Sequence, residues 1–221
     1  EQRDFIRANL GPALDAAKLS PQLWCWDHNW NQPEFPRAVL KSPEAARYVQ
    51  GTAWHFYEGS VEEQSRFHEE FPGKDTFFSE GSTFGVEGAM DIIEILRHWA
   101  RSYNAWVIML DEHQKPNRGP HDASRTCIEL KDNGEVEYRF DYYMYGQFMK
   151  FIPRGAVRID STTESLKGLA HVAFLTQDKR VVIVLANKAG EAREVGLGWQ
   201  GQTARVTLNP RSVTTLTWSA E

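Results

Sequence analysis

The sequence predicts alternating strands and helices that form half of a (β/α)8 barrel, followed by a small β-sandwich. Short apolar runs that end in polar or aromatic residues recur through the first two thirds of the chain, with helical segments between them. That alternation is typical of parallel β/α units. From Ala156 onward, short apolar runs are divided only by turn residues, which indicates an all-β region. The predicted half barrel covers residues 1–153 and the predicted sandwich covers residues 154–221.

The predicted barrel strands are residues 22–27, 51–57, 76–80 and 105–110. Polar side chains stand at or just beyond their ends: Asp27 and Asn29, His55 and Tyr57, Glu80, and Asp111 and Glu112. The carboxyl ends of parallel strands meet at one edge of a barrel, where barrel enzymes place their active sites. A strand that ends in a carboxylate and then turns at a glycine, as at Glu80, is a way to present a glycosidase nucleophile.

The predicted helices lie between these strands. The first spans residues 3–17 and is interrupted near Gly11-Pro12, and the second begins at a capping Ser42 followed by Pro43. A third begins at Ser60 with capping-box spacing. In the fourth, apolar residues repeat every three or four positions from Met90 to Tyr103. After a loop, Asp132-Asn-Gly predicts a hairpin between residues 126–130 and 136–140, and a helix follows over residues 141–152.

Composition excludes several classes of function. A net charge of −5 and a pI near 5.8 argue against nucleic acid as a partner, because phosphate binding needs a basic face. No apolar run approaches the roughly 18 residues that a membrane span requires. The two cysteines predict no disulfide framework, and no secretory signal is visible, so the compartment stays unknown. The chain starts at Glu1 rather than Met, as expected of a processed or trimmed chain or a piece of a longer one.

No metal and no cofactor are predicted. His28 and His55 lie at strand ends, but the sequence has no metal-ligand spacing such as His-Glu-x-x-His. We expect both to be hydrogen-bonding residues in a polar pocket.

Several motifs together resemble the C-terminal half of glycoside hydrolase family 30, the glucosylceramidase-like family. The matching stretches include Asp27-His-Asn29, Gly51…His55-Phe-Tyr57, Phe78-Ser-Glu80, Tyr145-Gly-Gln-Phe-Met-Lys150 and Val181-Val-Ile-Val-Leu-Ala-Asn187. The resemblance covers nearly the whole chain, in order. It implies barrel strands five to eight and a β-sandwich, and it implies cleavage of β-glycosides with retention.

The resemblance also implies roles for individual residues. Glu80 matches the family nucleophile at the seventh strand. The substrate-binding residues implied are His55 and Tyr57 at the sixth strand, Trp106 as the eighth-strand platform under the sugar, and Asp27 and Asn29 at the fifth strand.

The chain departs from the family pattern at the general acid/base. The family uses a Glu that follows an Asn at the end of the fourth strand, and this sequence contains no Asn-Glu dipeptide. Glu112, Asp27 and Glu34 lie at or beyond strand ends and are the candidates for that role. In addition, Val107 follows Trp106 where the family often has Asn, and Gln147 stands where His is common.

The leading hypothesis is therefore a retaining β-glycosidase that acts on β-glucosides or related exo-substrates. The alternative is a catalytically silent carbohydrate-binding half barrel, or a fragment that needs an N-terminal partner. Because four β/α units cannot close a barrel, we expect either a homodimer or a separate N-terminal half that completes it.

Overall fold

The computed structural model describes residues 1–118, 125–162 and 167–221. Contacts divide the chain into two compact units. The first comprises residues 1–81 and 95–105, and the second comprises residues 82–94 and 106–221. Helix α6 (Gly85–Arg97) contributes residues to both units.

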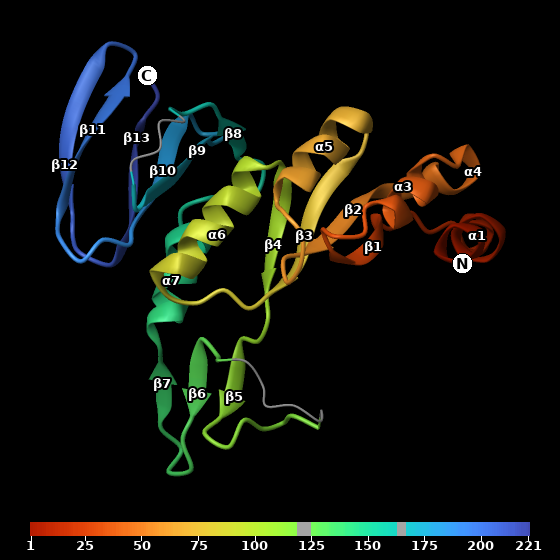
Figure 1. Cartoon of the computed structure of the whole chain (residues 1–221), viewed down its shortest axis with the longest axis horizontal. Coiled ribbons are helices and arrows are strands. Elements are labelled where there is room, and N and C mark those ends of the chain that lie inside the picture. The colour runs from red at the N-terminus through yellow and green to blue at the C-terminus, as the bar shows by residue number, and fades with distance from the viewer. Residues whose placement is uncertain (119–124, 163–166) are drawn as a thin grey trace. The chain divides into compact units, whose positions relative to one another are not determined.

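A parallel sheet forms the centre of the first unit (Figure 1). Its strand order is β1-β2-β3-β4, and each neighbouring pair is parallel. The strands are β1 (Leu23–Asn29), β2 (Val49–His55), β3 (Asp75–Gly81) and β4 (Ala100–Ala105). Strands that are consecutive in sequence are therefore neighbours in the sheet, which confirms the predicted β/α units. Strands β1 and β4 are its two edges.

The helices of this unit precede and connect the strands. They are α1 (Gln2–Phe5), the π-helix η1 (Ile6–Leu10), α2 (Gly11–Ala17), α3 (Glu34–Leu40), α4 (Pro43–Ala46) and α5 (Glu62–Glu70). The sequence had predicted no helix at α3. Pro36 is tolerated there because it lies in the first helical turn, where backbone N–H groups have no intrahelical partner.

The core of the first unit packs one face of the sheet against these helices. Phe78 on β3 is fully buried and stacks on Tyr103 of β4, with ring centroids 4.9 Å apart. Trp54 on β2 meets Phe67 of α5 edge to face at 5.0 Å. Large aromatic side chains from neighbouring strands therefore fill the space beneath the strand ends.

The fourth strand differs from its prediction. The apolar spacing predicted a helix as far as Tyr103 and a strand over residues 105–110, but α6 ends at Arg97 and β4 covers Ala100–Ala105. Trp99, with a left-handed φ of 75°, turns the chain, and Tyr103 lies on the strand. Trp99 and Tyr103 fit the three-to-four-residue spacing of the apolar residues of α6, although neither belongs to that helix. As a result, Asp111 does not end a strand of this sheet.

The second unit contains a small three-stranded sheet. Strand β5 (Met109–Asp111) pairs in parallel with β6 (Ile128–Leu130), which pairs antiparallel with β7 (Val136–Tyr138). The predicted hairpin is confirmed between β6 and β7. Helix α7 (Phe140–Met149) follows. Part of the predicted loop before β6, residues 119–124, lies outside the described residues.

The C-terminal part of the second unit is a two-layered β-region. One sheet has the order β13-β10-β9-β8, and the other pairs β11 with β12. Buried side chains from both sheets, including Ile183, Leu185, Val195 and Leu208, pack into one core. This confirms the predicted sandwich region, although β8 was not predicted. The strands are β8 (Val157–Ile159), β9 (Leu169–Leu175), β10 (Arg180–Asn187), β11 (Arg193–Trp199), β12 (Gln202–Leu208) and β13 (Ser212–Ser219).

Both cysteines are free and buried. Burial raises the pKa of the Cys25 thiol and of the Cys127 thiol to about 11, so both stay protonated at neutral pH. A nucleophile has to be sought among other residue types. Among the described helices, none is long and apolar enough to cross a membrane.

Replacing Phe78 by Ala should lower the free energy of unfolding by about 3–5 kcal/mol, because it opens a cavity in the core of the first unit. Chemical denaturation followed by tryptophan fluorescence measures this loss. Phe5, which is 55% exposed, provides the matched control, and its change to Ala should alter stability by no more than about 0.5 kcal/mol. Equal losses in the two variants would contradict the assignment of this core.

Candidate active site

Strand register brings the predicted residues of the first unit together. Asn29 pairs with His55 across β1 and β2, and His55 pairs with Glu80 across β2 and β3. These three residues therefore form a row across three adjacent parallel strands, at the carboxyl end of each. In barrel enzymes the catalytic residues lie at this carboxyl-terminal edge of the strands.

Glu80 is held by groups from the end of β2. The Tyr57 hydroxyl donates a hydrogen bond of 3.2 Å to Oε1 of Glu80, and Nδ1 of His55 lies 3.9 Å from the same oxygen. Among the described residues, no hydrogen bond is made to the second oxygen, Oε2. The Glu80 side chain is 31% exposed, so solvent and small molecules reach it.

Asn29 fixes the segment that carries Tyr57. It is buried, and its Oδ1 accepts a hydrogen bond of 3.2 Å from the backbone N–H of Tyr57. Its own backbone carbonyl accepts a 2.9 Å hydrogen bond from Nε1 of Trp26. In this structure Asn29 thus acts on the position of the Tyr57 hydroxyl.

Asp27 receives two donors at one oxygen. Its Oδ1 lies 3.1 Å from Nε2 of His55 and accepts a hydrogen bond of 2.7 Å from Oγ of Ser79. Sequence reasoning had singled out Asp27 and His55 but missed Ser79. The only signal for it was a polar residue between the aromatic pair Phe77-Phe78 and Glu80.

Trp106 belongs to the second unit. It is the first residue after β4, its side chain is 53% exposed, and its peptide bond to Val107 is cis. Its backbone carbonyl accepts a 2.9 Å hydrogen bond from Oγ of Ser82. Trp106 is therefore exposed, and its role as the platform under the sugar stays a prediction.

The loop that follows the Glu80 strand is anchored by α7. The Tyr145 hydroxyl donates a 2.6 Å hydrogen bond to the carbonyl of Thr83, and the buried carboxylate of Asp141 accepts one of 2.7 Å from the N–H of Gly85. Asp141 also forms a 2.8 Å ion pair with Arg125. Sequence reasoning gave Asp141 no role, because only the folded chain brings α7 to this loop.

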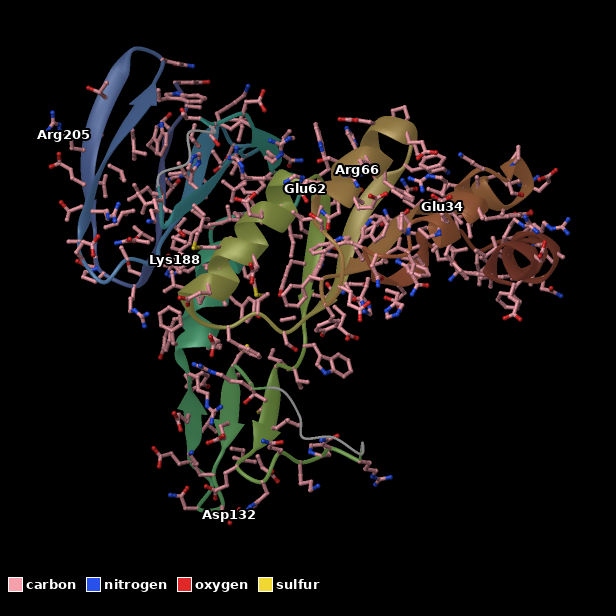
Figure 2. All side chains as sticks on the ribbon, viewed as in Figure 1. Glu34, Glu62, Arg66, Asp132, Lys188 and Arg205 are labelled. Atoms are coloured by element: carbon pink, nitrogen blue, oxygen red, sulfur yellow. The ribbon has the colours of Figure 1, made fainter. Side chains whose placement is uncertain are left out.

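Two of the acid/base candidates are engaged in local pairs. Glu34, labelled on α3 in Figure 2, is 84% exposed and lies 2.6 Å from the Arg37 guanidinium one helical turn later. Glu112 follows β5, not a strand of the four-stranded sheet, and its Oε1 accepts a 2.8 Å hydrogen bond from the N–H of Asp132. Their places in the fold therefore differ from the barrel strand ends expected from sequence.

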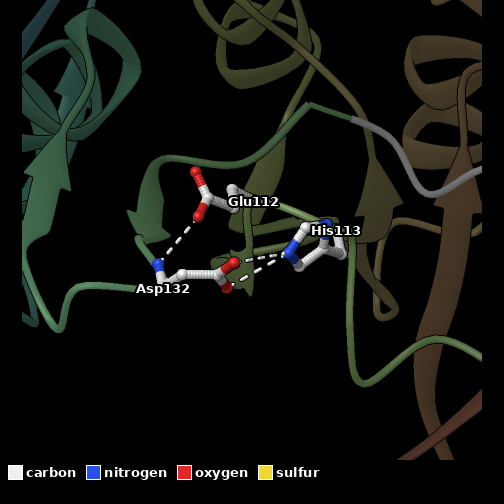
Figure 3. A group of neighbouring side chains, drawn as sticks. All are labelled: Glu112, His113 and Asp132. Carbon is white, nitrogen blue, oxygen red and sulfur yellow. Dashed lines mark hydrogen bonds and ion pairs between the residues drawn. The ribbon is translucent and has the colours of Figure 1, made fainter.

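Glu112, His113 and Asp132 form an exposed group, drawn in Figure 3, whose ligand atoms all lie within 4.8 Å of one another. Nε2 of His113 is 2.9 Å from the Asp132 carboxylate. The Asp132 carboxylate, by this hydrogen bond and by its charge, raises the pKa of His113. His113 is thus paired with the Asp132 side chain and Glu112 with the Asp132 backbone, and the sequence had assigned His113 and Asp132 no part in a site.

The family models match both parts of the chain. A model described as the TIM-barrel domain of glycosyl hydrolase family 30 matches residues 1–152, and one described as the β-sandwich domain of that family matches residues 155–216. The chain belongs to glycosyl hydrolase family 30. This confirms the resemblance found in the sequence motifs.

Among the relatives of this family 30 chain are proteins named as endo-1,6-β-D-glucanases and proteins named as glucosylceramidases. An endo-1,6-β-D-glucanase of Neurospora crassa is 34% identical over 207 residues, which cover 86% of this chain and 43% of the relative. The lysosomal acid glucosylceramidase of Mus musculus is 30% identical over 210 residues, or 86% of this chain and 41% of the relative. The solved structure of the endo-β1,6-glucanase BT3312 matches with a TM-score of 0.90 at 26% identity, covering 100% of this chain and 53% of that chain. The chain spans about half the length of the relatives it matches.

Changing Asp132 to Asn should lower the pKa of His113 toward its ordinary value of 6.5. A His whose pKa is raised on folding stabilises the fold below its unfolded pKa, and this contribution is lost as the pH rises through the raised value. Titration of the His113 ring protons by NMR measures the shift. Asp178→Asn, in the turn after β9, is the control and should leave the titration of His113 unchanged. An unaltered titration in Asp132→Asn would contradict the pairing.

Proposed function

We propose that this family 30 chain supplies the nucleophile of a retaining β-glycosidase that acts on β-glucosides. The observation that carries the proposal is the setting of Glu80. Its carboxylate ends β3 and takes one hydrogen bond at Oε1 from Tyr57, with the edge of His55 beside the same oxygen. A donor fixed at one oxygen orients the carboxylate and leaves Oε2 to attack the anomeric carbon.

In the proposed reaction, Oε2 of Glu80 forms a covalent bond to the anomeric carbon as the bond to the leaving group breaks. Water then hydrolyses the glycosyl ester with net retention. Trp106 is proposed as a stacking face for the sugar ring, since indole faces pack well against C–H groups. His55 and Asn29 are proposed to line the sugar site at the strand ends, where Asp27 is paired with His55.

A second carboxyl group has to protonate the leaving group, and retention requires it about 5–5.5 Å from the nucleophile. Glu112, Asp27 and Glu34 remain the candidates within this chain. All three are engaged with neighbours: Glu34 with Arg37, Glu112 with the backbone of Asp132, and Asp27 with His55 and Ser79. We therefore expect the acid/base to come from residues that complete the barrel.

The relatives' names support a glucose-containing substrate. One is an endo-1,6-β-D-glucanase and another an acid glucosylceramidase. Simple aryl β-glucosides and a β-1,6-linked glucan are therefore the first two substrates to compare.

One observation favours a second candidate function, a carbohydrate-binding half barrel without catalysis. Glu34 and Glu112, two of the three acid/base candidates, are each paired with a neighbour and not with a group beside Glu80. A chain that binds glucosides through Tyr57 and Trp106 and releases no product from any of them would match this alternative.

Glu80→Gln should abolish release of nitrophenol from aryl β-glucosides, with a loss of roughly a thousandfold or more, because a neutral amide cannot form the glycosyl ester. Glu62→Gln is the matched control: Glu62 is an exposed residue on α5, labelled in Figure 2, and should keep full activity. Equal turnover in Glu80→Gln and the original chain would overturn the assignment. Binding without turnover in either would favour the silent alternative.

We further propose that the open sheet is completed either by an N-terminal half, whether joined to this sequence or separate from it, or by a second copy. Three strands of the sheet carry a buried polar side-chain atom without a hydrogen-bond partner among the described residues: Nε1 of Trp24 on β1, Nε1 of Trp54 on β2 and Oγ of Ser102 on β4. Each such atom costs about 1–3 kcal/mol. Unpaired strand edges add to this cost.

If the sheet pairs with a second copy, light scattering should give twice the chain mass of 25.3 kDa. If it needs an N-terminal half, the chain should bind a separately produced polypeptide carrying the first four β/α units in a one-to-one complex. If the chain is strictly monomeric, has normal stability and does not bind this polypeptide, both forms of the proposal are contradicted.

A further inference from the structure

Strand β1 departs from regular strand geometry near its end, at Trp26 and Asp27. Trp26 and Asp27 have left-handed φ values of 82° and 65°, and the register between β1 and β2 shifts between Trp26 and His28. Non-glycine residues adopt this conformation only where their surroundings hold them in it. Here the backbone N–H of Trp26 donates to Oε1 of Gln2 at 3.0 Å, and its indole N–H donates to the carbonyl of Asn29.

The bulge places Asp27 against two strands at once. Its Oδ1 is 3.1 Å from Nε2 of His55 on β2 and accepts the 2.7 Å hydrogen bond from Ser79 on β3. Oγ of Ser79 also lies 3.4 Å from the carbonyl of Trp54, but a hydroxyl has one proton, and the shorter contact to a carboxylate is the stronger. One carboxylate oxygen of β1 thus contacts the ends of both β2 and β3, and Glu80 lies on β3 next to Ser79.

The contact with Asp27 sets both the ring orientation and the tautomer of His55. An ionised carboxylate only accepts hydrogen bonds, so Nε2 has to carry the shared proton. Nδ1 is then the nitrogen that faces Oε1 of Glu80, at 3.9 Å. The His55 side chain is only 11% exposed, so solvent does not compete freely for either nitrogen.

We propose that Asp27 is a positioning residue for Glu80, acting through His55 and Ser79 rather than as an acid/base. This inference rests on the proposed function of Glu80 as nucleophile. The imidazole ring of His55 has one carboxylate near each ring nitrogen, Asp27 at Nε2 and Glu80 at Nδ1. Ser79 precedes Glu80 in the chain, so its hydrogen bond fixes the backbone from which the nucleophile projects.

The test uses the full chain and a reagent that needs no acid/base. The probe is a dinitrophenyl β-glucoside that carries fluorine in place of the sugar's second hydroxyl group. A Glu80 oxygen bonds to the anomeric carbon, the bond to the aryl oxygen breaks, and dinitrophenolate leaves with the electron pair and no proton. Intact-mass spectrometry measures the rate constant for labelling at saturation and the probe concentration for half-maximal labelling.

Four variants separate positioning from general damage. Asp27→Ala removes the acceptor, Asp27→Asn keeps an acceptor oxygen in place without the charge, and Ser79→Ala removes the donor on β3. Asp15→Asn is the matched control, because Asp15 is an exposed carboxylate of the same unit that hydrogen-bonds Tyr48 and Arg47 instead.

We expect Asp27→Ala to lower the saturating labelling rate roughly 10- to 100-fold, with the half-maximal probe concentration within about twofold of the original. Asp27→Asn should recover part of this loss, Ser79→Ala should lose less than Asp27→Ala, and Asp15→Asn should label at the original rate. Asp27→Ala labelling as fast as Asp15→Asn would overturn the proposal. A change confined to the half-maximal concentration would also overturn it, because Asp27 would then contact the sugar.

An NMR measurement keeps the inference separate from the proposed function. If the original chain is not labelled at all, the proposed function fails for this chain, and the nitrogen shifts of His55 decide the inference. A single form protonated at Nε2, retained in Asp27→Asn and lost in Asp27→Ala, supports the positioning role. The same His55 spectrum in the original chain and in Asp27→Ala would overturn it.

Discussion

The register of three parallel strands is the constraint on which the rest of the site depends. Asn29, His55 and Glu80 are paired across β1, β2 and β3, and each lies at the end of its strand. Side chains alternate between the two faces of a strand, so a slip of one residue would carry a member of this row to the opposite face. The aromatic core beneath the row, with Trp54 and Phe78 fully buried, holds that register.

Two kinds of polar contact then refine the row. Buried or half-buried groups, such as the Asn29 amide and the His55 ring, are paired with the segments that carry the proposed reactive groups. The bulge at Trp26 and Asp27, where both φ angles are left-handed, interrupts the regular pairing of β1 with β2. It places the Asp27 carboxylate in contact with β2 and β3. Irregular backbone of this kind is costly, and it is found where a particular side-chain direction matters.

Much of the first unit could be predicted because local signals and tertiary packing agree there. Runs such as Thr76–Glu80 alternate with predicted helices, and the observed β3 and α5 follow them closely, although the predicted side-chain caps at Ser42 and Ser60 do not form. The prediction failed where two patterns overlapped. Trp99 and Tyr103 continue the spacing of α6, yet they pack as a turn and a strand. Glu112 was predicted to follow the fourth strand of the barrel sheet. It follows β5, which belongs to the three-stranded sheet.

By itself, the sequence determined the order of β/α units, the all-β region after them and the polar residues near the ends of the first three strands, because these follow from periodicity and turn chemistry along the chain. The family assignment rested on the same local motifs. Only the tertiary structure decided that Ser79 and His55 converge on one oxygen of Asp27, and that Tyr57 donates to Glu80. These contacts join residues more than twenty positions apart. They depend on strand register and on a bulge that no local pattern encodes.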